Sequence, residues 1–87
     1  MSRRVWKFPL PLRGGVLHAD MPAGARIVHV ALQDGAAKCW ALVDPHAEPV
    51  PRTFVIRGTG EPVGGGESYI GTVFTGPLVL HVFEVFA

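Results

Sequence analysis

The side chains in this sequence that could do chemistry are its histidines, its single cysteine and its carboxylates. None of the four histidines (His18, His29, His46 and His81) forms a His-x-His or His-x-x-x-His pair, and no Cys-x-x-Cys is present. Short spacings of these kinds are typical of metal sites. We therefore expect no metal and no other cofactor. A metal site assembled from residues on distant strands is the alternative left open.

The same residues give no catalytic constellation. Ser68 has no Gly-x-Ser-x-Gly context, and Cys39 lies inside an apolar run, where a packed, unreactive thiol is expected. The carboxylates are scattered and lie mostly in expected loops. Glu84 is the exception because it lies in an apolar run; it could pair with Arg52 or Arg57, but we expect it to face solvent. We predict no catalytic residue and no enzymatic activity.

One stretch, Arg57-Gly58-Thr59-Gly60, could bind an anion. Backbone N–H groups at glycines can form an anion nest, and Arg57 would add a bidentate donor. The stretch has no Walker lysine and no following helix, so a plain connection between strands is the competing interpretation. If the protein binds a small anionic ligand, we expect it here.

A second candidate ligand or interface contact is the pair His29 and Trp40. The pair lies in a predicted hairpin over residues 25–44, whose two apolar runs flank Asp34-Gly35. In the preferred register the numbers of two facing residues add up to 69. This register places His29 opposite Trp40 and Ile27 opposite Leu42. Both faces of this hairpin are then largely apolar. For His29, and equally for His81, we favour a mostly buried neutral imidazole over a ligand or interface contact.

The remaining strands follow from alternation of apolar and polar residues and from β-branched and aromatic content. We expect a first hairpin from residues 3–10 and 16–20, a proline-rich loop over 44–51 and an exposed, mobile loop over 58–67. Further strands are expected over 52–57, 68–74 and 78–86. No helical periodicity is present. The fold class is therefore all-β, a single small antiparallel barrel or two-layer sandwich of six to seven strands.

Length and charge limit the classes of function. The 87 residues make one β-rich domain, residues 1–87, with 48% hydrophobic and only 17% charged residues. So few charges favour a homo-oligomer over a compact monomer. The net charge of +1 disfavours nucleic acid. The fold could still gather five basic residues on one side: Arg3, Arg4, Lys7, Arg13 and Arg26.

Location is predicted from the N-terminal residues, the hydropathy and the cysteine. The first eleven residues contain no uninterrupted apolar run of signal-peptide length, and no run is long enough to span a bilayer. A lone cysteine cannot form a disulfide within the chain, which fits a reducing cytoplasm. We expect a cytoplasmic protein with no membrane contact.

Five stretches of the sequence are distinctive: residues 22–30, 39–45, 54–60, 69–73 and 80–84. The most specific are Trp-Ala-Leu-Val-Asp-Pro (40–45) and Tyr-Ile-Gly-Thr (69–72). Together they resemble a family of short uncharacterised proteins encoded by tailed bacteriophages and prophages. The resemblance implies a phage or prophage origin and a bacterial host cytoplasm. It implies no activity and no functional residues.

Three functions follow as hypotheses. The first is a non-enzymatic accessory protein that binds a host or phage protein and modulates the host. The second is a protein that binds or sequesters an anionic nucleotide at Arg57, Gly58, Thr59 and Gly60. The third is a β-barrel that binds single-stranded nucleic acid. We favour the first because it accounts for the low charge and the apolar strand faces.

Overall fold

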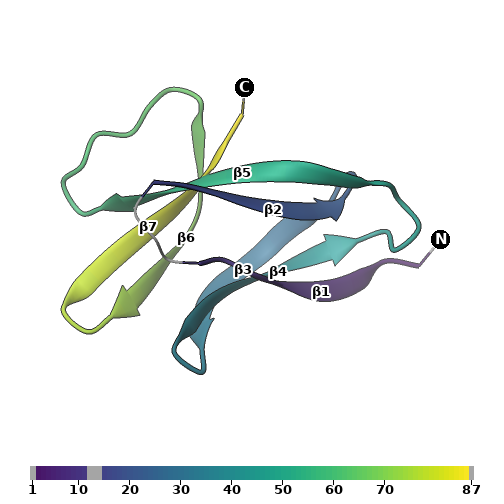
Figure 1. Cartoon of the computed structure of the whole chain (residues 1–87), viewed down its shortest axis with the longest axis horizontal. Coiled ribbons are helices and arrows are strands. Elements are labelled where there is room, and N and C mark those ends of the chain that lie inside the picture. Colours follow the sequence, from purple (N-terminus) through teal and green to yellow (C-terminus); the bar gives the residue numbers. More distant parts are fainter. Residues whose placement is uncertain (1, 12–14, 87) are drawn as a thin grey trace.

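The computed structural model describes residues 2–11 and 15–86, and these residues form seven antiparallel strands and no helix. Strands β1, β4 and β3 form a three-stranded sheet in that order, and β2, β5, β7 and β6 form a four-stranded sheet (Figure 1). The all-β prediction is confirmed, as the sandwich and not as the closed barrel. The bounds are β1 (Arg4–Pro9), β2 (Val16–Pro22), β3 (Arg26–Gln33), β4 (Ala36–Val43), β5 (Pro49–Gly58), β6 (Glu67–Thr75) and β7 (Leu78–Val85).

Alternation along each strand produces the core. In β4, the central strand of the three-stranded sheet, Ala37, Cys39, Ala41 and Val43 are buried, and the residues between them are not. Successive side chains of a strand point to opposite faces, so the buried set faces the second sheet. That sheet contributes the largest fully buried side chain, Phe54, to the same cluster.

The predicted hairpin over residues 25–44 is present as β3 and β4. Asp34 and Gly35 have φ of 54° and 78°, which is the positive-φ geometry of a tight hairpin turn. The predicted register holds from the turn back to His29↔Trp40. Beyond it the register shifts by one at a bulge, so Ile27 faces Ala41 and not Leu42. The extra residue, Val28, could not be predicted from alternation alone.

The predicted first hairpin is wrong. Strand β1 pairs with β4, and β2 pairs with β5 in the other sheet. Leu10 is buried, and its N–H donates to the carbonyl of Ala37 at 2.9 Å, so the chain follows β4 before it leaves this sheet. Both pairings join segments far apart in the sequence. The predicted turn at 13–15 lies largely outside the described residues.

The proline-rich loop is shorter than predicted because β5 already begins at Pro49. Pro49 and Pro51 lie opposite Pro22 and Asp20 of the edge strand β2. On its other side β5 pairs with β7 only from Thr53 onwards. The prolines therefore lie in a part of β5 that has no strand pairing on its β7 side, where a missing N–H breaks no ladder bond.

The two sheets approach closely where β3 crosses β6. A Cβ atom added at Gly71 of β6 would lie 2.6 Å from the Val30 Cβ of β3, a distance that real side chains do not adopt. Glycine is therefore required for this close approach. Strand β1, at the opposite edge of the three-stranded sheet, makes extensive strand contact only with β4 among the described residues.

The expectation that Glu84 faces solvent is wrong. Its side chain is only 6% exposed and pairs with Arg52: Nη2 donates to Oε1 at 2.8 Å, and Nε donates to Oε2. Arg52 Nη1 also donates to the carbonyl of Ala25 at 2.6 Å. The hydrogen bonds to Glu84 raise the pKa of the Arg52 guanidinium. The apolar surroundings of Glu84 therefore enclose an ion pair between the sheets.

Candidate interaction surface

The predicted anion-binding stretch lies at the end of β5 and the start of the exposed loop 59–66. Arg57 donates from Nε and Nη2 to the two carboxylate oxygens of Glu67, each at 2.8 Å. The N–H of Gly58 donates to Glu61 Oε1. Two groups that would hold an external anion are thus bound to carboxylates of this chain. Anion binding at Arg57, Gly58, Thr59 and Gly60 stays a prediction.

Glu67 holds the two ends of this loop together. It accepts the two bonds from Arg57 and, at 2.9 Å, the N–H of Gly64. These bonds, with Arg57 as the larger cause, lower the pKa of Glu67. The same contact raises the pKa of Arg57. Both side chains are therefore charged at neutral pH, and each is the hydrogen-bond partner of the other.

Thr59 begins a chain of side-chain hydrogen bonds across the outer face of the four-stranded sheet. Its hydroxyl lies 2.9 Å from His81 Nε2, and His81 Nδ1 lies 2.9 Å from the hydroxyl of Thr72. Thr72 in turn contacts the hydroxyl of Tyr69 at 2.6 Å. His81 is half-buried and bonded to neighbouring side chains, close to the interpretation from sequence.

The second predicted pair, His29 and Trp40, lies on the outer face of the other sheet. The ring centroids are 5.8 Å apart and the planes are inclined by 45°. His29 is exposed, so the interpretation as a buried imidazole is wrong for this residue; Trp40 is half-buried. The bulge at Val28 falls next to this pair. The two groups of predicted site residues therefore lie on different sheets and do not form one site.

Around Trp40, the outer face of the three-stranded sheet combines apolar and basic side chains. Cross-strand pairs share a face, so the register defines its rows. Lys7 and His29 flank Trp40, and Val5 and Arg26 flank Leu42. Val5 is 57% exposed. We call this surface the basic face; its members are Val5, Lys7, Arg26, His29, Lys38, Trp40 and Leu42.

The charges of the basic face have one sign. Strands β1, β3 and β4 contain Arg4, Lys7, Arg26 and Lys38 and no aspartate or glutamate. Within residues 2–11 and 15–86, none of these cations forms a salt bridge; the ion pairs are Arg52–Glu84 and Arg57–Glu67, both in the four-stranded sheet. Lys7 Nζ instead donates to the side-chain oxygen of Gln33 at 2.8 Å. Cations of one sign without paired carboxylates give this face a positive potential.

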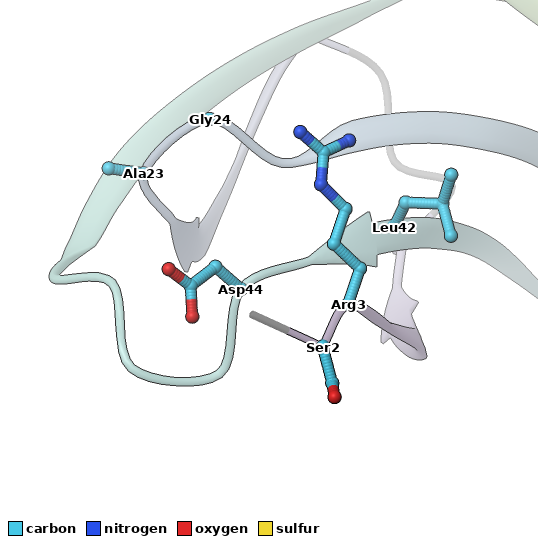
Figure 2. Close-up of a pocket in the computed structure, with 6 residues that line it drawn as sticks. All are labelled: Ser2, Arg3, Ala23, Gly24, Leu42 and Asp44. Atoms are coloured by element: carbon cyan, nitrogen blue, oxygen red, sulfur yellow. The ribbon is translucent and has the colours of Figure 1, made fainter.

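A pocket of about 390 Å³ lies at one end of the basic face, where β1 begins and β4 ends. Figure 2 shows the Arg3 side chain extending from the start of β1 toward β3, beside the end of β4. Asp44 lies on the other side of the opening and accepts the N–H of His46 at 3.0 Å. The residues that line the pocket are Ser2, Arg3, Ala23, Gly24, Leu42 and Asp44. Because Leu42 belongs to both, the pocket extends the basic face to Arg3.

The four-stranded sheet also exposes apolar side chains. Tyr69 is 58% exposed, and Phe74 and Leu78 are 69% and 56% exposed near the β6–β7 turn. Tyr69 packs edge-on against Phe83, with centroids 5.6 Å apart. This surface lacks unpaired strand cations, because Arg52 and Arg57 are both paired. It is a competing surface without the charge of the basic face.

Sequence reasoning found part of the basic face. It singled out His29 and Trp40 and named Arg3, Lys7 and Arg26 among basic residues that the fold could gather, and these lie on or next to the basic face. Arg13 lies outside the described residues. Lys38 and Val5 were missed as members. Counting charges by strand could have found the face, because β1, β3 and β4 together contain four arginines and lysines and no carboxylate.

Cys39 is fully buried on the inner face of β4, as predicted. Burial raises the pKa of its thiol to about 11, so the thiolate is scarce at neutral pH. The described part of the chain holds no group of three or more His, Cys, Asp or Glu side chains arranged to bind a metal ion. It also has no helix long and apolar enough to cross a membrane.

Comparison with known proteins identifies the family. Residues 1–87 match the model of a domain of unknown function (DUF7352). The chain belongs to this family. No curated protein and no solved structure gives a significant match. The match spans the whole chain and assigns no activity, so a functional proposal rests on the surface described above.

Proposed function

We propose that this DUF7352 protein is a non-enzymatic interaction protein that binds another protein through the basic face. The observation that carries the proposal is the separation of charge: the cations of β1, β3 and β4 have no carboxylate on their sheet. They lie among exposed Val5 and half-buried Trp40 and Leu42. Arginine and aromatic side chains are enriched at protein interfaces, and complementary charge speeds association.

We propose further that the protein is a phage or prophage accessory protein that acts on a host or phage protein in the bacterial cytoplasm. The resemblance of residues 40–45 and 69–72 to small phage-encoded proteins supports this origin. The apolar members of the basic face also support self-association as an alternative way to cover it.

A second candidate function, single-stranded nucleic-acid binding, is favoured by the position of Trp40 among cations. Base stacking on an aromatic ring beside a positive surface is the usual basis of such binding. Its affinity would fall steeply with salt. Fluorescence anisotropy with labelled single-stranded DNA at low salt tests it, and a flat titration rejects it.

The proposal is tested by affinity capture from bacterial lysate with matched variants. Val5→Ser with Val28→Ser removes exposed aliphatic groups from the three-stranded sheet, and Val16→Ser with Phe74→Ser does the same on the four-stranded sheet. We expect the first pair to lose a partner that the wild type and the second pair retain. Light scattering measures self-association. Partner retention by all three proteins, or no partner and a strict monomer, contradicts the proposal.

A further inference from the structure

Strand β1 forms one edge of the three-stranded sheet. Within residues 2–11 and 15–86 it pairs with β4 on one side and with no strand on the other. An edge strand presents unpaired N–H and C=O groups that can accept another extended segment. Pro9 ends this stretch because it has no N–H to donate. The available edge therefore runs from Arg4 to Phe8.

The inward side chains of β1 are only partly covered. Trp6 lies opposite Ala41 and Phe8 opposite Cys39, and both β4 residues are fully buried. Trp6 faces the same side and is nevertheless 39% exposed, and Phe8 is half-buried. The sandwich is thus short of apolar cover at this edge.

The opposite side of β1 belongs to the basic face. Val5 and Lys7 point outward beside Leu42 and Trp40, and Arg3 lies at the same end in the pocket of Figure 2. A second copy of β1 is a poor occupant, because it would bring a second Arg4 and a second Lys7 to the same short edge with no carboxylate between them. Basic residues on an edge strand disfavour such self-pairing.

We propose that the free edge of β1 binds an extended acidic and apolar segment of the partner protein, which adds as a fourth strand to the three-stranded sheet. Alternate side chains of such a segment point to opposite faces. Its apolar side chains cover Trp6 and Phe8, and its carboxylates lie beside Lys7 and Arg3. This inference rests on the proposed function and names the partner's chemistry and its mode of binding.

The probe is a fluorescein-labelled short peptide in which glutamate and valine alternate, titrated with the full chain and followed by anisotropy. We expect saturable binding that weakens as salt is added. Lys7→Glu should weaken binding about tenfold, because an attraction at the edge becomes a repulsion. Lys38→Glu also changes the basic face and alters the net charge equally, but Lys38 lies on the central strand β4 and not on the free edge, so it should weaken binding by less than about threefold.

Two further probes separate strand addition from docking on the face. The same peptide N-methylated at alternate residues cannot form the ladder on one edge and should not bind. In a Trp40→Phe variant, Trp6 is the remaining tryptophan, and its emission should shift to shorter wavelength as the peptide covers it. Circular dichroism checks that each variant is folded.

Equal binding of the N-methylated peptide, of a lysine–valine peptide, or of the Lys7→Glu variant would overturn the inference, as would absence of peptide binding. Tighter binding of single-stranded DNA than of the acidic peptide would also overturn it. If the peptide fails while the aliphatic variants of the three-stranded sheet still lose a captured partner, strand addition is wrong and the proposed function stands.

Discussion

The two sheets of this sandwich differ in whether their cationic side chains are paired with carboxylates. The four-stranded sheet pairs Arg52 with Glu84 in the interior and Arg57 with Glu67 at its surface. The three-stranded sheet carries arginines and lysines but no carboxylate. Charges that are paired within a chain stabilise its own fold. Unpaired charges of one sign produce a potential that attracts oppositely charged molecules. We therefore expect the paired charges of the four-stranded sheet to stabilise the fold, and we propose the three-stranded sheet as the partner surface.

The largest effect is expected where the interior pair is broken. Glu84→Ala leaves the guanidinium of Arg52 without its carboxylate between the sheets, and removing one partner of a buried pair costs about 3 kcal/mol. Urea unfolding followed by tryptophan fluorescence measures the loss. Replacing both residues by apolar ones, Glu84→Leu with Arg52→Met, should recover most of the stability. An unchanged midpoint for Glu84→Ala would show that the pair does not organise the fold.

The contact between the sheets at Gly71 comes next. Gly71→Ala places a Cβ atom 2.6 Å from that of Val30, and overpacking of this kind costs roughly 1–3 kcal/mol. The control is Gly65→Ala, whose added Cβ meets nothing within 4 Å. Thermal unfolding of the two variants should differ clearly. Equal melting temperatures would mean that the sheets can separate there at no cost.

The surface pair Arg57–Glu67 should produce a smaller effect that depends on pH. Because the pKa of Glu67 is lowered in the folded protein, its contribution to stability is present above the ordinary glutamate pKa. The contribution is lost as pH falls through the folded-state pKa. The free energy of unfolding should therefore decline less steeply with acid in Glu67→Gln than in the wild type. Parallel profiles of the two proteins would contradict this assignment.

The smallest effect on stability is expected on the basic face. Lys7→Glu and Lys38→Glu change exposed or half-exposed side chains without a salt-bridge partner in the described chain, so each should change the free energy of unfolding by less than about 0.5 kcal/mol. Thermal unfolding measures this directly. A larger loss would give these lysines a structural role and weaken the contrast between the sheets.

Local chemistry made much of the fold predictable. Alternation and turn residues located the strands, and Asp34-Gly35 placed His29 beside Trp40. What failed depends on contacts distant in sequence. No local pattern tells β1 to pair with β4, or marks Val28 as a bulge. Glu84 was misjudged because its partner Arg52 lies 32 residues away.

The candidate site was predictable to a similar extent. Residue type drew attention to Arg57, but its guanidinium is bound to Glu67 across a loop that the sequence does not position. The basic face was visible only in outline, because knowing that Lys7, Arg26 and Lys38 share a surface requires the sheet order. Sheet order is decided by packing of the whole chain and not by any one segment.

The most direct test of the central claim is a heteronuclear NMR titration of the labelled protein with the alternating glutamate–valine peptide. If the three-stranded sheet is the partner surface, the largest shift changes will fall on the backbone amides of β1, on neighbouring β4 and on the Trp40 indole. The amides around Tyr69 and Phe74 will then remain unchanged. Changes confined to β6 and β7, or no change along β1, would contradict the account.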